Sequence, residues 1–266
     1  MTFDLHRGSA PLLVSIPHLG TRIPDDLQGV YVPRALDVED TDWHLDRLYA
    51  FAHDLGASVL RPTVSRYVID LNRPPDDAPM YPGASNTELC PTRFFTGDPL
   101  YRDGAAPDAA QKAQRRATYW EPYHQALADE LARIRAAHGW VLLWEAHSIR
   151  SEIPWLFAGV LPDLNIGTAD GAAAHPSVTL AVAEAAARAP AGITHAVNGR
   201  FKGGYITRRY GRPAEHVHAV QLEMTQKQYM REAPPYEWME ERAAVVQPVV
   251  RGMVEAAFQT CARLYA

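Results

Sequence analysis

Residues 140–147 have the sequence WVLLWEAH, an apolar run of strand type that ends with a glutamate and a histidine. A second run of this kind, LLVSIPH at 12–18, also ends in a histidine. Two further apolar runs carry polar side chains near their ends, YVIDLNR at 67–73 and VHAVQLE at 217–223. In open α/β sheets, ligands bind outside the carboxyl ends of the strands. The four runs therefore predict an α/β fold with a functional site at that edge of the sheet.

The composition favours a chain that handles small molecules. With 266 residues, 47% of them hydrophobic, a single catalytic domain over residues 1–266 is the simplest expectation. A formal charge of −5 without a Lys/Arg cluster argues against nucleic acid or an anionic membrane as a partner. Cys90 and Cys261 lie outside any CxxC motif, which fits a reducing compartment. Since no signal-type or membrane-spanning apolar stretch is found, we expect a cytoplasmic protein.

The remaining segments alternate between helical and strand patterns. Thr41 is of the residue type that caps helices, and apolar residues at helical spacing follow it as far as Gly56. Residues 74–107 hold seven of the 21 prolines, so we expect a long loop that forms a lid or a pocket wall. Helices are expected over 109–138 with an interruption near Pro122, over 175–188 and over 236–265, and strands over 12–16, 58–64, 67–71, 140–144, 193–197 and 217–222.

The two histidines at the ends of apolar runs indicate a zinc site. A catalytic zinc ion needs about three nitrogen or oxygen ligands and an open position for water. His18 and His147 can supply two ligands, because both are expected at the same edge of the sheet. No acidic residue follows His18 at the short spacing of an HxxE motif. We expect Asp42 to be the third ligand, with Asp40 and His44 as alternatives.

Glu223 ends an otherwise apolar strand, where an unpaired carboxylate is costly. One partner that would satisfy it is a metal-activated water, which makes Glu223 a candidate general base. The alternative is a structural salt bridge to one of the arginines. Both interpretations remain open on sequence grounds.

Arginines near the run at 67–73 suggest an acidic substrate. The planar guanidinium of Arg73 matches a carboxylate in bidentate fashion, so Arg73 with Asn72 is a candidate clamp for a carboxylate. Arg66 could stabilise the oxyanion that forms when a carbonyl is attacked. These assignments together predict metal-assisted hydrolysis of a small acidic molecule.

Six motifs spread over nearly the whole chain identify a family resemblance: SIPH at 15–18, TDWHLD at 41–46, IDLNR at 69–73, EAHSIR at 145–150, FKGGYITR at 201–208 and QLE at 221–223. Their combination resembles the N-formylglutamate deformylases, or N-formylglutamate amidohydrolases, of bacterial histidine degradation. The resemblance implies a three-layer α/β/α fold with a central mixed sheet, similar to zinc carboxypeptidases and aspartoacylase. It also implies one divalent metal ion, zinc, and hydrolysis of N-formyl-L-glutamate to formate and L-glutamate.

The resemblance also implies roles for individual residues. Asn72 and Arg73 would hold a substrate carboxylate, Arg66 would stabilise the oxyanion, and Glu223 would be the base. Two features depart from the related carboxypeptidase-type pattern. The HxxE motif is absent, and Glu145 stands where an aspartate that orients the metal-binding histidine is expected.

The segment 198–211 combines four glycines with spaced cations, a composition suited to anions. Given the resemblance, Lys202, Arg208 and Arg209 would meet the second carboxylate of a dicarboxylate substrate, opposite the Arg73 side. Two other functions stay open on the sequence alone. One is a related metal-dependent N-acyl amino acid hydrolase or carboxypeptidase, and the other is a non-catalytic carboxylate-binding protein.

Overall fold

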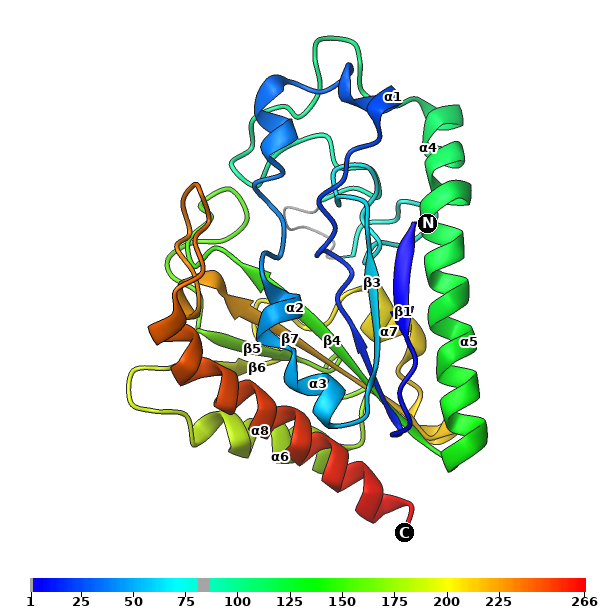
Figure 1. Cartoon of the computed structure of the whole chain (residues 1–266), viewed down its shortest axis with the longest axis vertical. Helices are drawn as coiled ribbons and strands as arrows, with labels where there is room; N and C mark the ends of the chain where they lie inside the picture. Colours follow the sequence, from blue (N-terminus) through cyan, green and yellow to red (C-terminus); the bar gives the residue numbers. More distant parts are fainter. Residues whose placement is uncertain (1, 81–86) are drawn as a thin grey trace.

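The computed structural model describes residues 2–80 and 87–266 and has an α/β fold built on a mixed sheet (Figure 1). Its strands are β1 (Phe3–His6), β2 (Leu12–Ser15), β3 (Ser58–Pro62), β4 (Val141–Ile149), β5 (Leu164–Gly167), β6 (His195–Val197) and β7 (Val217–Thr225). They lie in the order β1-β3-β2-β4-β7-β5-β6. The neighbours β3, β2, β4 and β7 are parallel, whereas β1 and β5 run antiparallel to β3 and β7. The predicted α/β class with a mixed sheet is confirmed.

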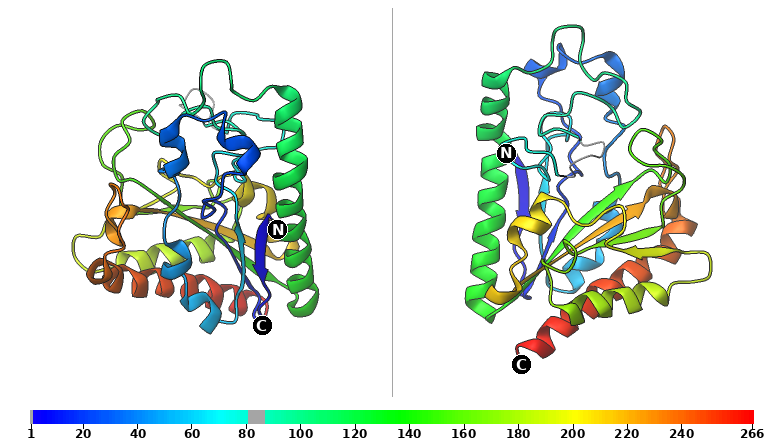
Figure 2. Two further views of the ribbon diagram at one scale, coloured as in Figure 1. Left: turned by 45° about the horizontal axis from the view of Figure 1, so that its top comes forward. Right: turned by 180° about the vertical axis from the view of Figure 1, so that it is seen from behind.

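Helices cover both faces of the sheet, which confirms the three-layer arrangement (Figures 1 and 2). Alternate residues of β4 show the two cores: Leu142 and Trp144 pack into one, and Val141 and Leu143 into the other. The first core holds residues of α2 (Leu45–Leu48), α3 (Phe51–Asp54), α6 (Pro176–Ala187) and α8 (Glu240–Leu264). The second holds residues of α5 (Glu121–His138) and α7 (Tyr205–Tyr210). The remaining helices are α1 (Asp25–Gln28) and α4 (Ala109–Arg115), with 3₁₀ turns at Pro33–Asp37, Pro213–Glu215 and Gln226–Gln228.

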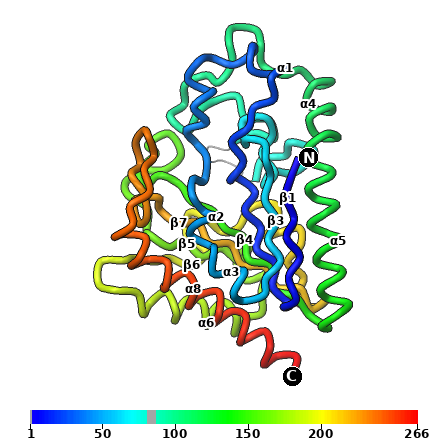
Figure 3. The backbone as a smooth tube through the Cα atoms, viewed as in Figure 1, coloured from blue at the N-terminus to red at the C-terminus, as the bar shows by residue number. Residues whose placement is uncertain are grey.

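The strands at the centre of the sheet extend beyond their predicted ends. β4 continues to Ile149 and β7 to Thr225, because the polar residues at their carboxyl ends are buried and keep pairing. His147 therefore lies within β4 instead of after it, directly opposite Glu223 of β7 in the strand register. This pairing brings two of the predicted functional residues onto neighbouring strands (Figure 3).

The prediction of a strand over 67–71 is wrong. These residues form turns whose backbone groups bond to loops and side chains instead of to a neighbouring strand. Tyr31 Oη donates to the carbonyl of Tyr67, and Asp70 N donates to the carbonyl of Leu89. The apolar side chains are buried as expected, but by irregular segments of the chain.

The single helix expected from Thr41 to Gly56 is also wrong. Two short helices, α2 and α3, take its place, and His44 precedes α2 in the left-handed region with a φ of 60°. Thr41 does not cap either helix, since its hydroxyl donates to the carbonyl of Val38. The backbone of Asp42 is instead fixed by a hydrogen bond from its N–H to the carbonyl of His18.

The long helix predicted over 109–138 is confirmed, and its interruption is a π-helical turn at Arg116–Trp120, just before Pro122. Residues 74–107 are irregular where they are described, and part of this segment, 81–86, lies outside the described residues. Thr87 and Phe95 from this segment line the cavity discussed below, so the segment does form a pocket wall. Among the described residues, no helix is both long and apolar enough to cross a membrane.

Candidate active site

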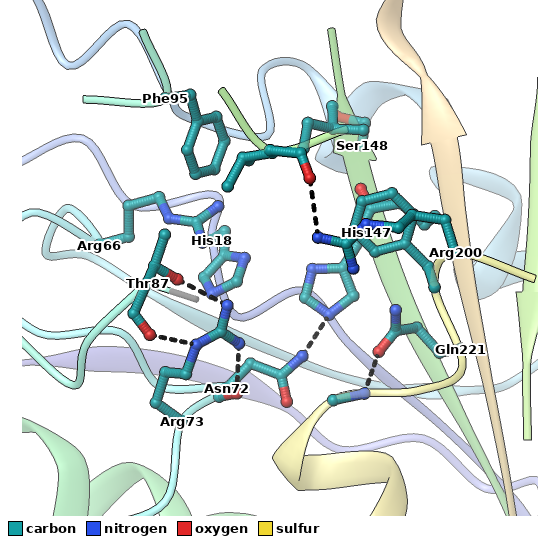
Figure 4. A pocket seen from close by; sticks show the side chains of 15 residues that line it. His18, Arg66, Asn72, Arg73, Thr87, Phe95, His147, Ser148, Arg200 and Gln221 are labelled. Atoms are coloured by element: carbon teal, nitrogen blue, oxygen red, sulfur yellow. Dashed lines mark hydrogen bonds between the residues drawn. The ribbon is translucent and has the colours of Figure 1, made fainter. Parts of the chain in front are cut away.

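A cavity of ≈ 600 Å³ opens at the carboxyl ends of β2, β4 and β7 (Figure 4). It unites residues that are far apart in the sequence, as expected for the edge of a parallel sheet. Polar side chains dominate one part of its wall and apolar side chains the other. The lining residues are His18, Arg66, Asn72, Arg73, Thr87, Phe95, His147, Ser148, Ile149, Leu156, Arg200, Phe201, Gly204, Gln221 and Glu223.

Three buried side chains at the base of this cavity could hold a metal ion. His18, Asp42 and His147 each offer a ligand atom, and these atoms all lie within 4.8 Å of one another. Asp42 Oδ2 is 3.1 Å from His147 Nδ1 and 3.7 Å from His18 Nδ1. Burial alone would raise the pKa of Asp42, but the nearby His18 and His147 hold it well below its usual range. The cluster thus combines two imidazoles with an ionised carboxylate.

The other ring nitrogen of each histidine is held by a carboxylate. His18 Nε2 lies 2.7 Å from Asp70 Oδ1, and His147 Nε2 lies 3.3 Å from Glu145 Oε1. Carboxylates in this position fix the orientation of metal-binding histidines. Glu145 was expected near His147 from the sequence, whereas Asp70 was not expected beside His18. Its signal was a single acidic residue inside the apolar run YVIDL.

The two alternatives for the third ligand lie elsewhere. The carboxylate of Asp40 accepts hydrogen bonds from Tyr67 Oη and from the backbone N–H of Phe95. His44 Nε2 lies 2.7 Å from the carbonyl oxygen of Tyr236. Of the three candidates, only Asp42 belongs to the cluster with His18 and His147.

Glu223 is buried at the wall of the cavity, with 7% of its surface exposed. In the part of the chain that the structure describes, it forms no salt bridge, so the alternative of a structural ion pair finds no support there. Burial raises the pKa of Glu223 to about 8, and the opposing charge of His147 offsets only part of this effect. A carboxylate in this environment has a high affinity for a proton, as a general base requires.

Arg66 lies beside the histidine cluster and is itself buried. Its Nη2 donates to Asp70 Oδ2 at 2.7 Å, and its Nη1 lies 3.6 Å from Asp42 Oδ1. The guanidinium therefore has a fixed position between two acidic residues that also contact the histidines. In Figure 4 it faces the cavity next to His18.

Asn72 and Arg73 line the side of the cavity below His147 in Figure 4. Arg73 Nε and Nη2 donate to the backbone carbonyl and hydroxyl of Thr87. Asn72 Oδ1 accepts from the N–H of Ile206 at the start of α7, and its Nδ2 lies 3.0 Å from His147 Nε2. Gly204 packs so closely that an added Cβ would collide with the Asn72 amide.

The expected cations of the segment 198–211 do not line this cavity. Lys202 lies 3.1 Å from Asp170, and Arg208 and Arg209 are on the exposed side of α7. The cavity is instead lined by Arg200 of the same segment, which donates to the carbonyl of Leu156. The cationic segment therefore does contribute to the cavity, but among the described lining residues its arginine is Arg200, not Arg208 or Arg209 of α7.

A stacked pair on the long helix supports the backbone at 71–73. Trp120 and His124 stack with ring centroids 3.7 Å apart. Trp120 Nε1 donates to the carbonyl of Arg73, and His124 Nε2 lies 2.8 Å from the carbonyl of Leu71. Since a carbonyl only accepts, His124 Nε2 carries the proton and Nδ1 accepts from Tyr210 Oη.

This arrangement predicts a pH-dependent stability. Burial lowers the pKa of His124 to about 4, below the value of about 6.5 expected in the unfolded chain. The contribution of neutral, buried His124 to the free energy of unfolding is therefore complete above pH 6.5, and it is lost as the pH falls toward 4. Relative to the non-titrating variant His124→Gln, wild type should lose about 2 kcal/mol more stability between pH 7.5 and 5 in urea unfolding.

The exposed His195 provides the control for this measurement. The variant His195→Gln should keep the pH dependence of wild type. If the free energy of unfolding depended on pH equally in wild type and in His124→Gln, a neutral, buried His124 would be contradicted.

Several known proteins are similar to this chain in sequence or in structure. A sequence model of the N-formylglutamate amidohydrolase family matches residues 10–230. An N-formylglutamate deformylase of Pseudomonas aeruginosa is 50% identical over 250 residues, which cover 94% of this chain and 93% of the relative. One of Pseudomonas putida is 48% identical over 253 residues, covering 95% and 94% of the two chains. The crystal structure of an N-formylglutamate amidohydrolase from Ralstonia eutropha shares the fold, with a TM-score of 0.80 over 98% of both chains at 24% identity.

Proposed function

The chain belongs to the N-formylglutamate amidohydrolase family, and we propose that it hydrolyses N-formyl-L-glutamate to formate and L-glutamate. The observation that carries this proposal is one cavity lined by the two histidines of the candidate metal-binding cluster, by the buried Glu223 and by three arginines. The metal-binding cluster and Glu223 supply the means to activate water, and the arginines suit a substrate with two carboxylates. We further propose that the reaction belongs to histidine degradation, as the sequence resemblance implies, and that it takes place in the cytoplasm, as the composition led us to expect.

We propose that His18, Asp42 and His147 hold one divalent ion, zinc. The donor set fits, because two imidazole nitrogens and one carboxylate oxygen converge while Asp70 and Glu145 occupy the outer ring nitrogens. A zinc ion bound there would polarise the formyl carbonyl and lower the pKa of the attacking water.

Two residues of the cavity act on the reacting atoms. Glu223 takes the proton from the attacking water and passes it to the leaving nitrogen, so that the amine departs neutral. A carboxylate suits this double role, because it accepts a proton as the anion and releases it once protonated. Arg66 donates hydrogen bonds to the oxyanion as the carbonyl is attacked, from the position that Asp70 fixes.

The two carboxylates of the substrate bind to different arginines in this proposal. Arg73 and Asn72 take one carboxylate, as the sequence resemblance implies. Arg200 takes the other, because it lines the same cavity. We assign no substrate contact to Lys202, Arg208 or Arg209, because they do not line the cavity among the residues described.

The variant Arg200→Ala tests the second carboxylate site. A charge-assisted hydrogen bond contributes about 1.5–3 kcal/mol, so KM for N-formyl-L-glutamate should rise about 10- to 100-fold. The KM for N-formyl-L-alanine, which lacks the second carboxylate, should change little. Steady-state kinetics of formate release with both substrates measures the difference.

The matched control is Arg209→Ala, an exposed arginine from the same segment. Its KM values should equal those of wild type for both substrates. A parallel rise of both KM values in Arg200→Ala would remove Arg200 from the second site.

The experiment that tests the proposed function is formate release from N-formyl-L-glutamate by the purified protein. Activity should disappear when a chelator removes the metal and return when zinc is added back. Failure to release formate under any of these conditions would refute the proposal.

A further inference from the structure

The wall of the cavity next to Arg66 is apolar and is formed by the ring of Phe95. The ring is 6% exposed and lies over the Arg66 guanidinium, with Arg66 Cζ 4.7 Å from the ring centroid. It packs into a small hydrophobic cluster with Ile149, Ile153 and Leu161. In Figure 4, Phe95 lies beyond Arg66, on the far side of the cavity from Asn72.

The backbone of Phe95 is held by a buried carboxylate. Its N–H donates to Asp40 Oδ2 at 2.9 Å, and the same oxygen accepts from Tyr67 Oη at 2.8 Å. Asp40 Oδ1 accepts from Arg150 Nη2 at 2.9 Å. These bonds fix the backbone from which the ring projects, and the ring itself is held by its packing against Ile149, Ile153 and Leu161. A larger ligand would have to displace this packed ring or break the buried bond of the Phe95 N–H, so the wall resists displacement.

The orientation of the substrate follows from the sites assigned above, and the inference therefore rests on the proposed function. The amino acid part is held by Asn72 and Arg73, and the carbonyl under attack lies between Glu223 and Arg66. The group attached to the carbonyl carbon then points away from the amino acid part. Because Phe95 lies on the far side of the cavity from Asn72, this direction leads toward Phe95. In a formyl group this substituent is a hydrogen atom, and in an acetyl group it is a methyl.

We propose that Phe95 sets the acyl-group specificity, excluding acyl groups larger than formyl by occupying the space beyond the carbonyl carbon. The exclusion is steric, because a methyl group would have to enter a packed and anchored wall. Asp40 acts as a positioning residue that holds Phe95 in place and makes no contact with the substrate.

The test compares kcat/KM for N-formyl- and N-acetyl-L-glutamate in wild type and in Phe95→Ala. Because formyl groups are intrinsically more reactive, the informative quantity is the change in the formyl-to-acetyl ratio between proteins. Steric discrimination of one methyl group is worth about 10- to 100-fold, so the ratio should fall by that factor in Phe95→Ala. The fall should come from a gain in acetyl hydrolysis.

The matched control is Phe157→Ala, which removes the same side chain from the edge of the same hydrophobic cluster. Among the described residues, the cavity lining includes Phe95 but not Phe157, so this variant should keep the wild-type ratio. Phe95→Leu, a smaller change, should shift the ratio in the same direction as Phe95→Ala.

A second measurement needs only wild type, in case both Phe95 variants fail to fold. N-acetyl-L-glutamate should be a weak competitive inhibitor of formate release, because its methyl group hinders binding. Its Ki should be at least about tenfold above the Ki of L-glutamate, the product of the reaction. Tight inhibition by N-acetyl-L-glutamate, or an unchanged ratio in folded variants, would overturn the role of Phe95. Absence of formate release by wild type would instead refute the proposed function itself.

Discussion

Replacing Glu223 by glutamine is expected to lower kcat for N-formyl-L-glutamate hydrolysis by about 10³- to 10⁴-fold, because a positioned general base contributes up to this much. Glutamine has nearly the same shape, but its amide cannot take a proton from water or return one to the leaving nitrogen. KM should change little, since Glu223 is assigned no contact with either carboxylate. Formate release under saturating substrate measures kcat directly.

Metal content separates this effect from a loss of the ion. Glu223 is outside the His18–Asp42–His147 cluster, so the glutamine variant should retain as much zinc as wild type by atomic emission. Glu130→Gln is the matched control, because Glu130 is also buried but pairs with Arg133 on α5. It should lower stability and leave kcat unchanged. A Glu223→Gln variant within tenfold of the wild-type kcat would exclude Glu223 as the base.

The sheet could be predicted from the sequence because the cores lie on both of its faces. β2 and β4 are apolar on successive residues, which only a strand buried on both faces requires. The run at 67–71 has the same composition, yet its backbone groups bond to Leu89 and to side chains such as Tyr31. Such partners come from distant loops, and local periodicity carries no information about them.

The site residues on or near strands could be predicted because they stand at the ends of apolar strand patterns. For residues whose position depends on the conformation of a loop, the sequence left several candidates open. The strand pattern predicts His18 and His147 as metal ligands. It does not choose the third ligand among Asp40, Asp42 and His44, because these three residues are neighbours in the sequence. The choice among them depends on the hydrogen bond from Asp42 N to the carbonyl of His18, which a sequence does not reveal. Likewise, Arg200 and Arg208 belong to one cationic segment, but Arg200 precedes α7 and lines the cavity, whereas Arg208 lies on α7, where the sequence predicted no helix.

The variant Asp42→Asn is expected to lose the metal ion and, with it, activity by about 10³-fold or more, since a catalytic metal supplies several kcal/mol of transition-state stabilisation. The neutral amide keeps the size of the side chain and can still accept from the N–H of Ser148, as Asp42 does. It lacks the negative charge that offsets the charge of a divalent ion. Metal content after dialysis, with formate release on the same samples, measures both losses.

Asp40→Asn is the matched control, because both aspartates are buried and stand two positions apart. The asparagine side chain keeps an oxygen that can accept from Phe95 N and Tyr67 Oη, so this variant should retain on the order of one zinc ion per chain. The pair distinguishes a general effect of charge near the site from ligation, since only Asp42 shares a centre with the two histidines. Loss of zinc from Asp40→Asn and its retention by Asp42→Asn would reverse the assignment of the third ligand.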